Sequence, residues 1–139
     1  MDKAFEVIDH TADIGIIAYG ADIKEVFTNA ALGLFNLITN LADVGEDTSR
    51  YIELSSQDTE NLLVEWLNEL LYTFDAEHIV FKSFHIDDLS HNHLKATCRG
   101  AKIDPDRQRI KREIKAATYH MLAINRDDSG YKAQIIFDI

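Results

Sequence analysis

Residues 58–74 read DTENLLVEWLNELLYTF, and this stretch decides the fold that the sequence predicts. Its large apolar residues recur at intervals of three and four, the spacing of one face of an α-helix. Ser56 or Asp58 is placed to cap the first turn of that helix. The apolar stripe consists of Leu62, Leu63, Trp66, Leu67, Leu70, Leu71 and Phe74, and the other face carries Glu65, Asn68 and Glu69. We interpret the stripe as that of the main core helix, packed on a sheet, in preference to a segment that fills a partner's groove.

A second helix is predicted upstream, and short strands surround both helices. Asp22 and Glu25 have the spacing of a capping box, and helical periodicity continues from Ile23 to Ile38. Runs rich in β-branched residues predict strands at 5–9, 14–19, 51–54, 79–81, 84–86, 94–98 and 131–139. This order predicts an α+β fold in a single domain, with two main helices packed on a mixed or antiparallel β-sheet.

One segment between the strands fits two kinds of secondary structure. Polar and turn-forming residues predict loops or turns at 43–47, 100–108 and 125–130. Segment 110–119 fits a helix by the spacing of Ile110, Ile114, Ala117 and Met121, and a strand by the alternation of Ile114, Ala116 and Thr118. The sequence leaves both interpretations open.

The composition is that of one globular domain covering residues 1–139. Apolar residues make up 46% of the chain and charged residues 27%, which are ordinary values for such a domain. The single cysteine, Cys98, excludes an intramolecular disulfide and fits a reducing compartment. We find neither a signal-peptide pattern nor an apolar run near the ~20 residues that a membrane helix needs. We therefore expect a cytoplasmic protein with no membrane partner.

The charge of the chain is strongly negative and unevenly distributed. Fourteen Lys and Arg against 24 Asp and Glu give a net charge of −10. Residues 1–98 carry a net −13, and residues 99–139 carry a net +3. So acidic a chain is not expected to bind nucleic acid directly. The asymmetry fits an acidic face with a local basic patch for a partner, and it equally fits solvated charges that fell unevenly.

Segment 9–13, DHTAD, places two carboxylates and an imidazole within five residues, between two predicted strands. Alternate residues of an extended segment face the same way, so Asp9 and Asp13 are predicted to share a side. Asp138 interrupts an apolar terminal strand, where a carboxylate needs a partner or exposure. Together with the terminal carboxylate of Ile139, these oxygens are candidate ligands for a divalent cation. The alternative is that Asp9 or Asp13 caps a turn by accepting backbone N–H groups.

Other residue types suit chemistry but have plainer interpretations. Cys98 is interpreted as a small buried hydrophobe in a strand, in preference to a nucleophile paired with a histidine. His91 and His93 lie in a predicted turn and are interpreted as solvated side chains. The chain contains none of the tight zinc spacings and no glycine-rich phosphate loop.

A basic run lies in the second half of the chain. It comprises Arg107, Arg109, Lys111, Arg112 and Lys115. Such a run can hold a phosphate or an acidic partner surface. It can also be a solvated basic edge that discourages sheet aggregation.

Four blocks of the sequence resemble the archease family. The blocks are DHTADIG at 9–15, EWLNELL at 65–71, EIKAATYH at 113–120 and FDI at 137–139, in family order across nearly the whole chain. The first and third blocks together are specific, whereas any one block alone is a weak signal.

The resemblance implies a small cytoplasmic α+β protein, not itself an enzyme, that activates an RNA ligase of the tRNA-splicing type. That ligase joins an RNA end carrying a 2′,3′-cyclic phosphate or 3′-phosphate to a 5′-hydroxyl end. Its histidine is first guanylylated from GTP with a divalent metal. Archeases promote that guanylylation, keep the ligase turning over and can broaden its nucleotide use. Members have also been viewed as chaperone-like modulators of a tRNA methyltransferase.

The resemblance also implies a set of site residues. The family's metal ligands correspond to Asp13, Asp138 and the terminal Ile139, and its metal is usually described as calcium. Possible neighbours of the site, taken from the first and third blocks, are Asp9, His10, Lys115 and His120.

Two alternatives to a metal-dependent activator stay open. One is a chaperone-like binding module that acts through its surface and needs no metal. The other is a metal-dependent phosphoester hydrolase, with a metal-bound water as nucleophile. That hydrolase would use Asp9, His10, Asp13 and His120.

Overall fold

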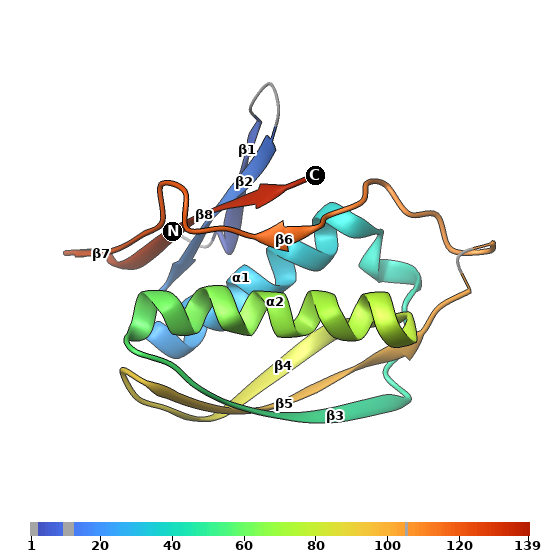
Figure 1. Ribbon diagram of the computed structural model, residues 1–139, viewed down its shortest axis with the longest axis horizontal. Helices are drawn as coiled ribbons and strands as arrows, with labels where there is room; N and C mark the ends of the chain where they lie inside the picture. The colour runs from blue at the N-terminus through green and yellow to red at the C-terminus, as the bar shows by residue number, and fades with distance from the viewer. Residues whose placement is uncertain (1–2, 10–12, 105) are drawn as a thin grey trace.

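The computed structural model describes residues 3–9, 13–104 and 106–139 and confirms the α+β class (Figure 1). Its helices are α1 (Ile23–Ile38), the short 3₁₀ helix η1 (Leu41–Asp43) and α2 (Thr59–Glu77). Its strands are β1 (Phe5–Asp9), β2 (Asp13–Gly20), β3 (Thr48–Ser55), β4 (Ile79–Leu89), β5 (His93–Lys102), β6 (Ala116–Ala117), β7 (Ala123–Asp127) and β8 (Gly130–Asp138). Both predicted helices are present at the predicted places.

The strands form two antiparallel sheets, and the helices lie between them. One sheet has the order β1-β2-β8-β6, with β7 also paired to β8, and the other has the order β3-β5-β4. Figure 1 shows α1 and α2 between the upper sheet, which contains β8, and the lower sheet. α1 contacts β2 of one sheet and β4 of the other, so its apolar residues are covered from two sides. The sequence predicted the strands but not their division into two sheets.

The core is shared by the helices and both sheets. Trp66 of α2 is fully buried, and its indole N–H donates a 3.0 Å hydrogen bond to the carbonyl oxygen of Phe27 in α1. The ring of Phe84 in β4 meets the Trp66 ring edge to face, with centroids 6.0 Å apart. Burial of each such large apolar side chain contributes about 1.5–3 kcal/mol. The buried part of the predicted α2 stripe is Leu62, Leu63, Trp66, Leu67, Leu70 and Leu71.

Both helices begin at an aspartate cap. The Asp22 carboxylate accepts the Glu25 N–H at 2.8 Å, and Glu25 Oε1 in return accepts the N–H of Ala21 at 2.7 Å. At α2, Asp58 is the cap, and its carboxylate accepts the Asn61 N–H at 2.8 Å. Those hydrogen bonds from Asn61 hold the pKa of Asp58 below its ordinary value. The choice between Ser56 and Asp58 is thereby resolved.

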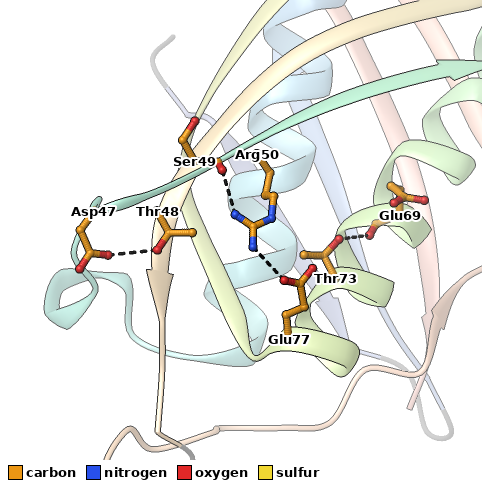
Figure 2. A network of polar contacts seen from close by, with 7 residues as sticks. All are labelled: Asp47, Thr48, Ser49, Arg50, Glu69, Thr73 and Glu77. Carbon is orange, nitrogen blue, oxygen red and sulfur yellow. Dashed lines mark hydrogen bonds and ion pairs between the residues drawn. The ribbon is translucent and has the colours of Figure 1, made fainter.

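The far end of α2 is tied to the three-stranded sheet (Figure 2). Arg50 of β3 donates from Nη2 to Glu77 Oε1 at 2.8 Å and from Nη1 to the carbonyl oxygen of Ser49 at 3.0 Å. The guanidinium therefore balances a carboxylate at the helix C-terminus, where negative charge is unfavourable. Within the helix, the Thr73 hydroxyl donates to the Glu69 carbonyl oxygen at 3.1 Å.

Two of the predicted strands are one strand in the structure. β4 runs through 79–81 and 84–86 without a break, and its pairing with β5 shifts register between Phe81 and Ser83 and between Ile86 and Asp88. A β-bulge lets a strand continue while one residue is left out of the ladder. The period-2 pattern is lost at each bulge, which is why the sequence suggested two strands.

The ambiguous segment 110–119 is not helical. Only Ala116 and Ala117 form a strand, and the residues before them run irregularly along the C-terminal end of α1. The predicted turn at 125–130 is also shorter than expected, because β7 continues to Asp127 and only two residues separate it from Gly130.

Among the described residues, no helix is both long enough and apolar enough to span a membrane.

Candidate functional site

Two aspartates face each other at the end of the five-stranded sheet. In the antiparallel pairing of β2 with β8, Asp13 is the register partner of Asp138. Side chains of directly opposed residues lie on one face of the sheet, with Cβ atoms roughly 4.5–5.5 Å apart. Two residues of the predicted ligand set, 125 positions apart in the sequence, are thus neighbours.

The pair combines one sheltered carboxylate and one exposed carboxylate. Asp13 is half-buried, with its Oδ1 oxygen shielded from solvent, whereas Asp138 is exposed. Like charges placed directly opposite on neighbouring strands repel and destabilise the sheet. A cation placed between two such carboxylates would offset their mutual repulsion.

The strand β6 pairs with β8 on the side opposite to β2. Ala116 is the register partner of Asp138, and the Lys115 N–H donates to the Asp138 carbonyl oxygen at 2.8 Å. Lys115 is exposed, and its backbone is held beside the carboxylate pair. The structure thus places the backbone of Lys115 beside that of Asp138, and the role of its side chain at the site stays a prediction.

Asn68 of α2 holds β6 in this position. Its Nδ2 donates to the Ala117 carbonyl oxygen at 3.1 Å, and its Oδ1 accepts the Ala117 N–H at 2.8 Å. The carboxamide thus takes the place of a neighbouring strand on the outer edge of β6. Sequence reasoning put Asn68 on the polar face of α2 and missed this role. The signal was a carboxamide within an acidic face, but nothing in the sequence indicated its target.

The other predicted neighbours are not assembled around the pair. Asp9 is the register partner of Ile14, so it lies on the opposite face of the sheet from Asp13, and the expected common side is wrong. His10 lies outside the described residues. His120 follows Thr118, whose N–H and hydroxyl both donate to the Ile136 carbonyl oxygen. His120 therefore lies further along β8, beyond the level of Ile136 and away from Asp138.

The basic run supports the end of α1. Arg112 Nη1 donates to the Leu37 carbonyl oxygen at 3.0 Å, and the Lys111 N–H donates to the Ile38 carbonyl oxygen at 2.7 Å. A cation at a helix C-terminus is favourable, and the last turn of α1 contains no basic residue of its own. Part of the run thus has a structural role. All five residues of the run are exposed: Arg107, Arg109, Lys111, Arg112 and Lys115.

Cys98 and His93 lie in β5 of the other sheet, whereas His91 lies in the turn before it, so the prediction of a solvated turn residue is confirmed for His91 and wrong for His93. Cys98 is fully buried in β5. Burial, and to a smaller extent the nearby charge of Asp87, raises the pKa of its thiol to about 12. This agrees with a small core residue and not with a nucleophile. His91 is exposed, whereas His93 begins β5 and lies 3.0 Å from Glu53 Oε2 and 2.9 Å from the Ser55 hydroxyl.

The donor set at the sheet end suits a hard divalent cation. Calcium binds carboxylate and carbonyl oxygens, and two opposed carboxylates supply the first of these. Within 3–9, 13–104 and 106–139, no three side chains of His, Cys, Asp or Glu gather as a metal-binding group. Of the predicted ligands, Asp13 and Asp138 are the two whose side chains the structure places opposite each other, and Ile139 directly follows Asp138 in the chain.

The fold and the site define a small α+β protein with an acidic site at the end of an antiparallel sheet. The model of the archease protein family (MTH1598/TM1083) matches residues 5–139. The chain belongs to the archease family.

Curated relatives and solved structures agree with this assignment. The chain is 42% identical to protein archease of Methanosarcina acetivorans, over 99% of this chain and 97% of the relative. It is similar to the solution structure of Methanobacterium thermoautotrophicum protein 1598, with a TM-score of 0.84 and 40% identity, covering 98% of this chain and 99% of the other. It is also similar to the crystal structure of an archease, possible chaperone, from Thermotoga maritima, with a TM-score of 0.67, 25% identity and 95% and 94% coverage.

Proposed function

We propose that this archease is a cytoplasmic, non-enzymatic accessory protein that activates an RNA ligase of the tRNA-splicing type. It would promote guanylylation of the ligase and sustain its multiple turnover with the help of a bound divalent cation. The observation that carries the proposal is the facing pair Asp13 and Asp138, whose carboxylate oxygens are chemically suited to a cation.

The cation, which we propose to be calcium, would be held by Asp13, Asp138 and the carboxylate of Ile139. When bound, it would supply positive charge that neutralises these oxygens and can attract phosphate. The chain's own residues would then orient the site. The backbone N–H of Lys115 donates to the backbone carbonyl oxygen of Asp138. The exposed ammonium of Lys115 would then be available near the site for contact with an anionic group.

The overall charge supports a protein partner over direct RNA binding. A net charge of −10 repels a phosphate backbone and favours encounter with a basic protein surface. An RNA ligase needs basic surface to hold its own substrate, so it is a partner of suitable charge.

The decisive experiment is a guanylylation assay of the ligase from the same organism, with this protein added as wild type or as Asp138→Asn. We expect the wild type to raise the rate of guanylylation and the variant to lose at least ten-fold of that stimulation. Asp128→Asn is the matched control, because Asp128 is also an exposed aspartate next to β8 but lies in the turn at its other end. Equal stimulation by wild type and Asp138→Asn would overturn the proposal.

Two variants of Asp13 separate the alternatives. A chaperone-like modulator of a tRNA methyltransferase would bind its partner equally well after chelation and after Asp13→Ala. A hydrolase would turn over a phosphoester without any partner and lose that activity on Asp13→Asn. Either result would replace the activator proposal.

A further inference from the structure

The turn between β6 and β7 presents two large side chains to solvent. Tyr119 is 57% exposed and Met121 is 55% exposed, and a single residue separates them. Tyrosine and methionine are enriched at protein–protein interfaces, where they supply contact area. Exposed apolar residues that occur singly need no explanation, but two that share one turn form a local patch.

The turn is a defined structure. The Leu122 N–H donates to the Tyr119 carbonyl oxygen at 3.3 Å, and Gln134 Nε2 of β8 donates to the Met121 carbonyl oxygen at 3.1 Å. Met121 adopts a left-handed backbone conformation with φ of 55°, which is unfavourable for a long side chain. Such a conformation persists only where the surrounding contacts enforce it. The contacts hold both side chains outward instead of letting the turn relax.

A groove of about 470 Å³ lies beside the Tyr119 ring. It is formed by the chain that enters α2 and by the exposed start of that helix. The lining residues are Ser55, Ser56, Gln57, Asn61, Glu65 and Tyr119. Figure 1 shows the loop between β6 and β7 above the N-terminal end of α2. The groove is polar on the helix side and aromatic on the turn side.

The charge around the groove is negative. Glu65 lines the groove itself, and the first half of α2 contains neither Lys nor Arg. Glu60, also exposed, receives the Ile124 N–H at 3.3 Å and so lies next to the start of β7. An exposed aromatic ring beside carboxylates is the environment that binds arginine, whose guanidinium stacks on the ring and pairs with the acids. The same carboxylates repel a nucleic acid phosphate.

We infer that the turn Tyr119–Met121 and the adjoining start of α2 form a docking surface for an arginine-bearing segment of a protein partner. The identification of that partner as the RNA ligase rests on the proposed function. The surface itself does not, because it follows from the exposure, the enforced turn and the charge of the groove. β6 connects this turn to Lys115 through the chain, and the turn itself lies further along β8, at Gln134, than the carboxylate pair.

The first test uses an arginine-rich peptide as the probe, with a lysine-rich peptide of equal charge for comparison, followed by NMR. We expect amide shifts confined to residues 118–122 and the start of α2, and tighter binding of the arginine peptide. Tyr119→Ala should weaken its binding at least ten-fold without changing thermal unfolding. Tyr51→Ala is the matched control, since Tyr51 is 58% exposed on the other sheet. Shifts that centre elsewhere, or equal weakening by both variants, would overturn the inference.

The second test measures affinity for the ligase with the same variants. Binding by the wild type that Tyr119→Ala weakens at least ten-fold, and Tyr51→Ala does not, supports the docking surface. A wild type that fails to bind the ligase overturns the proposed function, while the peptide result still decides the docking surface. Two further outcomes contradict it: a self-association that Tyr119→Ala abolishes, and single-stranded RNA binding that depends on Tyr119.

Discussion

The two sheets of this protein differ in which charged residues face each other across neighbouring strands. In the three-stranded sheet, Lys95 of β5 has Glu53 of β3 on one side and Asp88 of β4 on the other. In the five-stranded sheet, Asp138 has Asp13 on one side and the uncharged Ala116 on the other. Opposite charges across strands stabilise a sheet and like charges destabilise it.

The difference separates a region that serves stability from a region that serves function. The three-stranded sheet has long ladders, a buried Cys98 and compensated charges on its outer face. The end of the five-stranded sheet holds two facing carboxylates beside a strand of two residues. That strand depends on the carboxamide of Asn68 for its outer edge. Changes in the first region should therefore alter folding, and changes in the second should alter ligand binding.

The largest expected effect is on the rate at which a thiol reagent labels Cys98. Its pKa of about 12, against an ordinary 9.0, lowers the thiolate fraction near pH 8 by about a thousand-fold. We expect labelling by a thiol reagent to be slower by at least that factor in the native protein than in denaturant. Because folding favours the protonated thiol, its contribution to stability is full below pH 9 and is lost as the pH rises toward 12. Rapid labelling of the native protein would show that this sheet is not a closed layer.

The next largest effect is expected for Gly100→Ala in the same sheet. A Cβ atom on Gly100 would overlap the Val80 carbonyl oxygen and lie 2.6 Å from the Phe81 Cα, and backbone atoms cannot move aside cheaply. We expect a loss of at least about 3 kcal/mol in the free energy of unfolding, measured in urea. Calcium affinity of the folded fraction should stay as in the wild type. Reduced affinity in that fraction would break the division between the two regions.

Asn68→Ala tests the support of β6. It leaves the N–H and carbonyl groups of buried Ala117 without their partner, at a cost of about 2 kcal/mol. We expect faster amide hydrogen exchange at Lys115 and Ala117, together with weaker calcium binding. Asn36→Ala is the control, because the Asn36 carboxamide donates to the Leu32 carbonyl oxygen of its own helix. If Lys115 kept its protection in Asn68→Ala, the supporting role would be disproved.

The smallest expected changes in the free energy of unfolding have opposite signs in the two sheets. In chelator, Lys95→Ala should lower the free energy of unfolding by about 0.2–1 kcal/mol, because Glu53 and Asp88 lose the opposite charge on the strand between them. Asp138→Asn should raise it by a similar amount, because the repulsion from Asp13 is removed. Equilibrium unfolding of the two variants and the wild type measures both. Destabilisation by Asp138→Asn under these conditions would mean that the pair is not repulsive.

The parts of this account that were predictable from the sequence are local ones. The α2 stripe, the Asp22 cap and the terminal strand depend on residues close together in the chain, and the structure confirms them. Register is not local. The sequence suggested Asp13 and Asp138 as ligands of one site, but only the pairing of β2 with β8 makes them face each other.

The predictions that failed also depend on contacts between residues far apart in the sequence. Asp9 was assigned to the wrong face because that face is set by its pairing with Ile14. The segment 110–119 could not be assigned because tertiary contacts decide its course. Asn68, Asp138 and Ile136 hold its backbone, and none of them is near it in the sequence.

Thermal unfolding of the wild type and of Asp138→Asn, each with calcium and with a chelator, tests most directly whether the facing carboxylates form a cation site. A ligand that binds only the folded state raises its stability. The account predicts that calcium raises the melting temperature of the wild type, that it leaves Asp138→Asn unchanged, and that in chelator the variant melts no lower than the wild type. An equal response of both proteins to calcium, or no response in either, would contradict it.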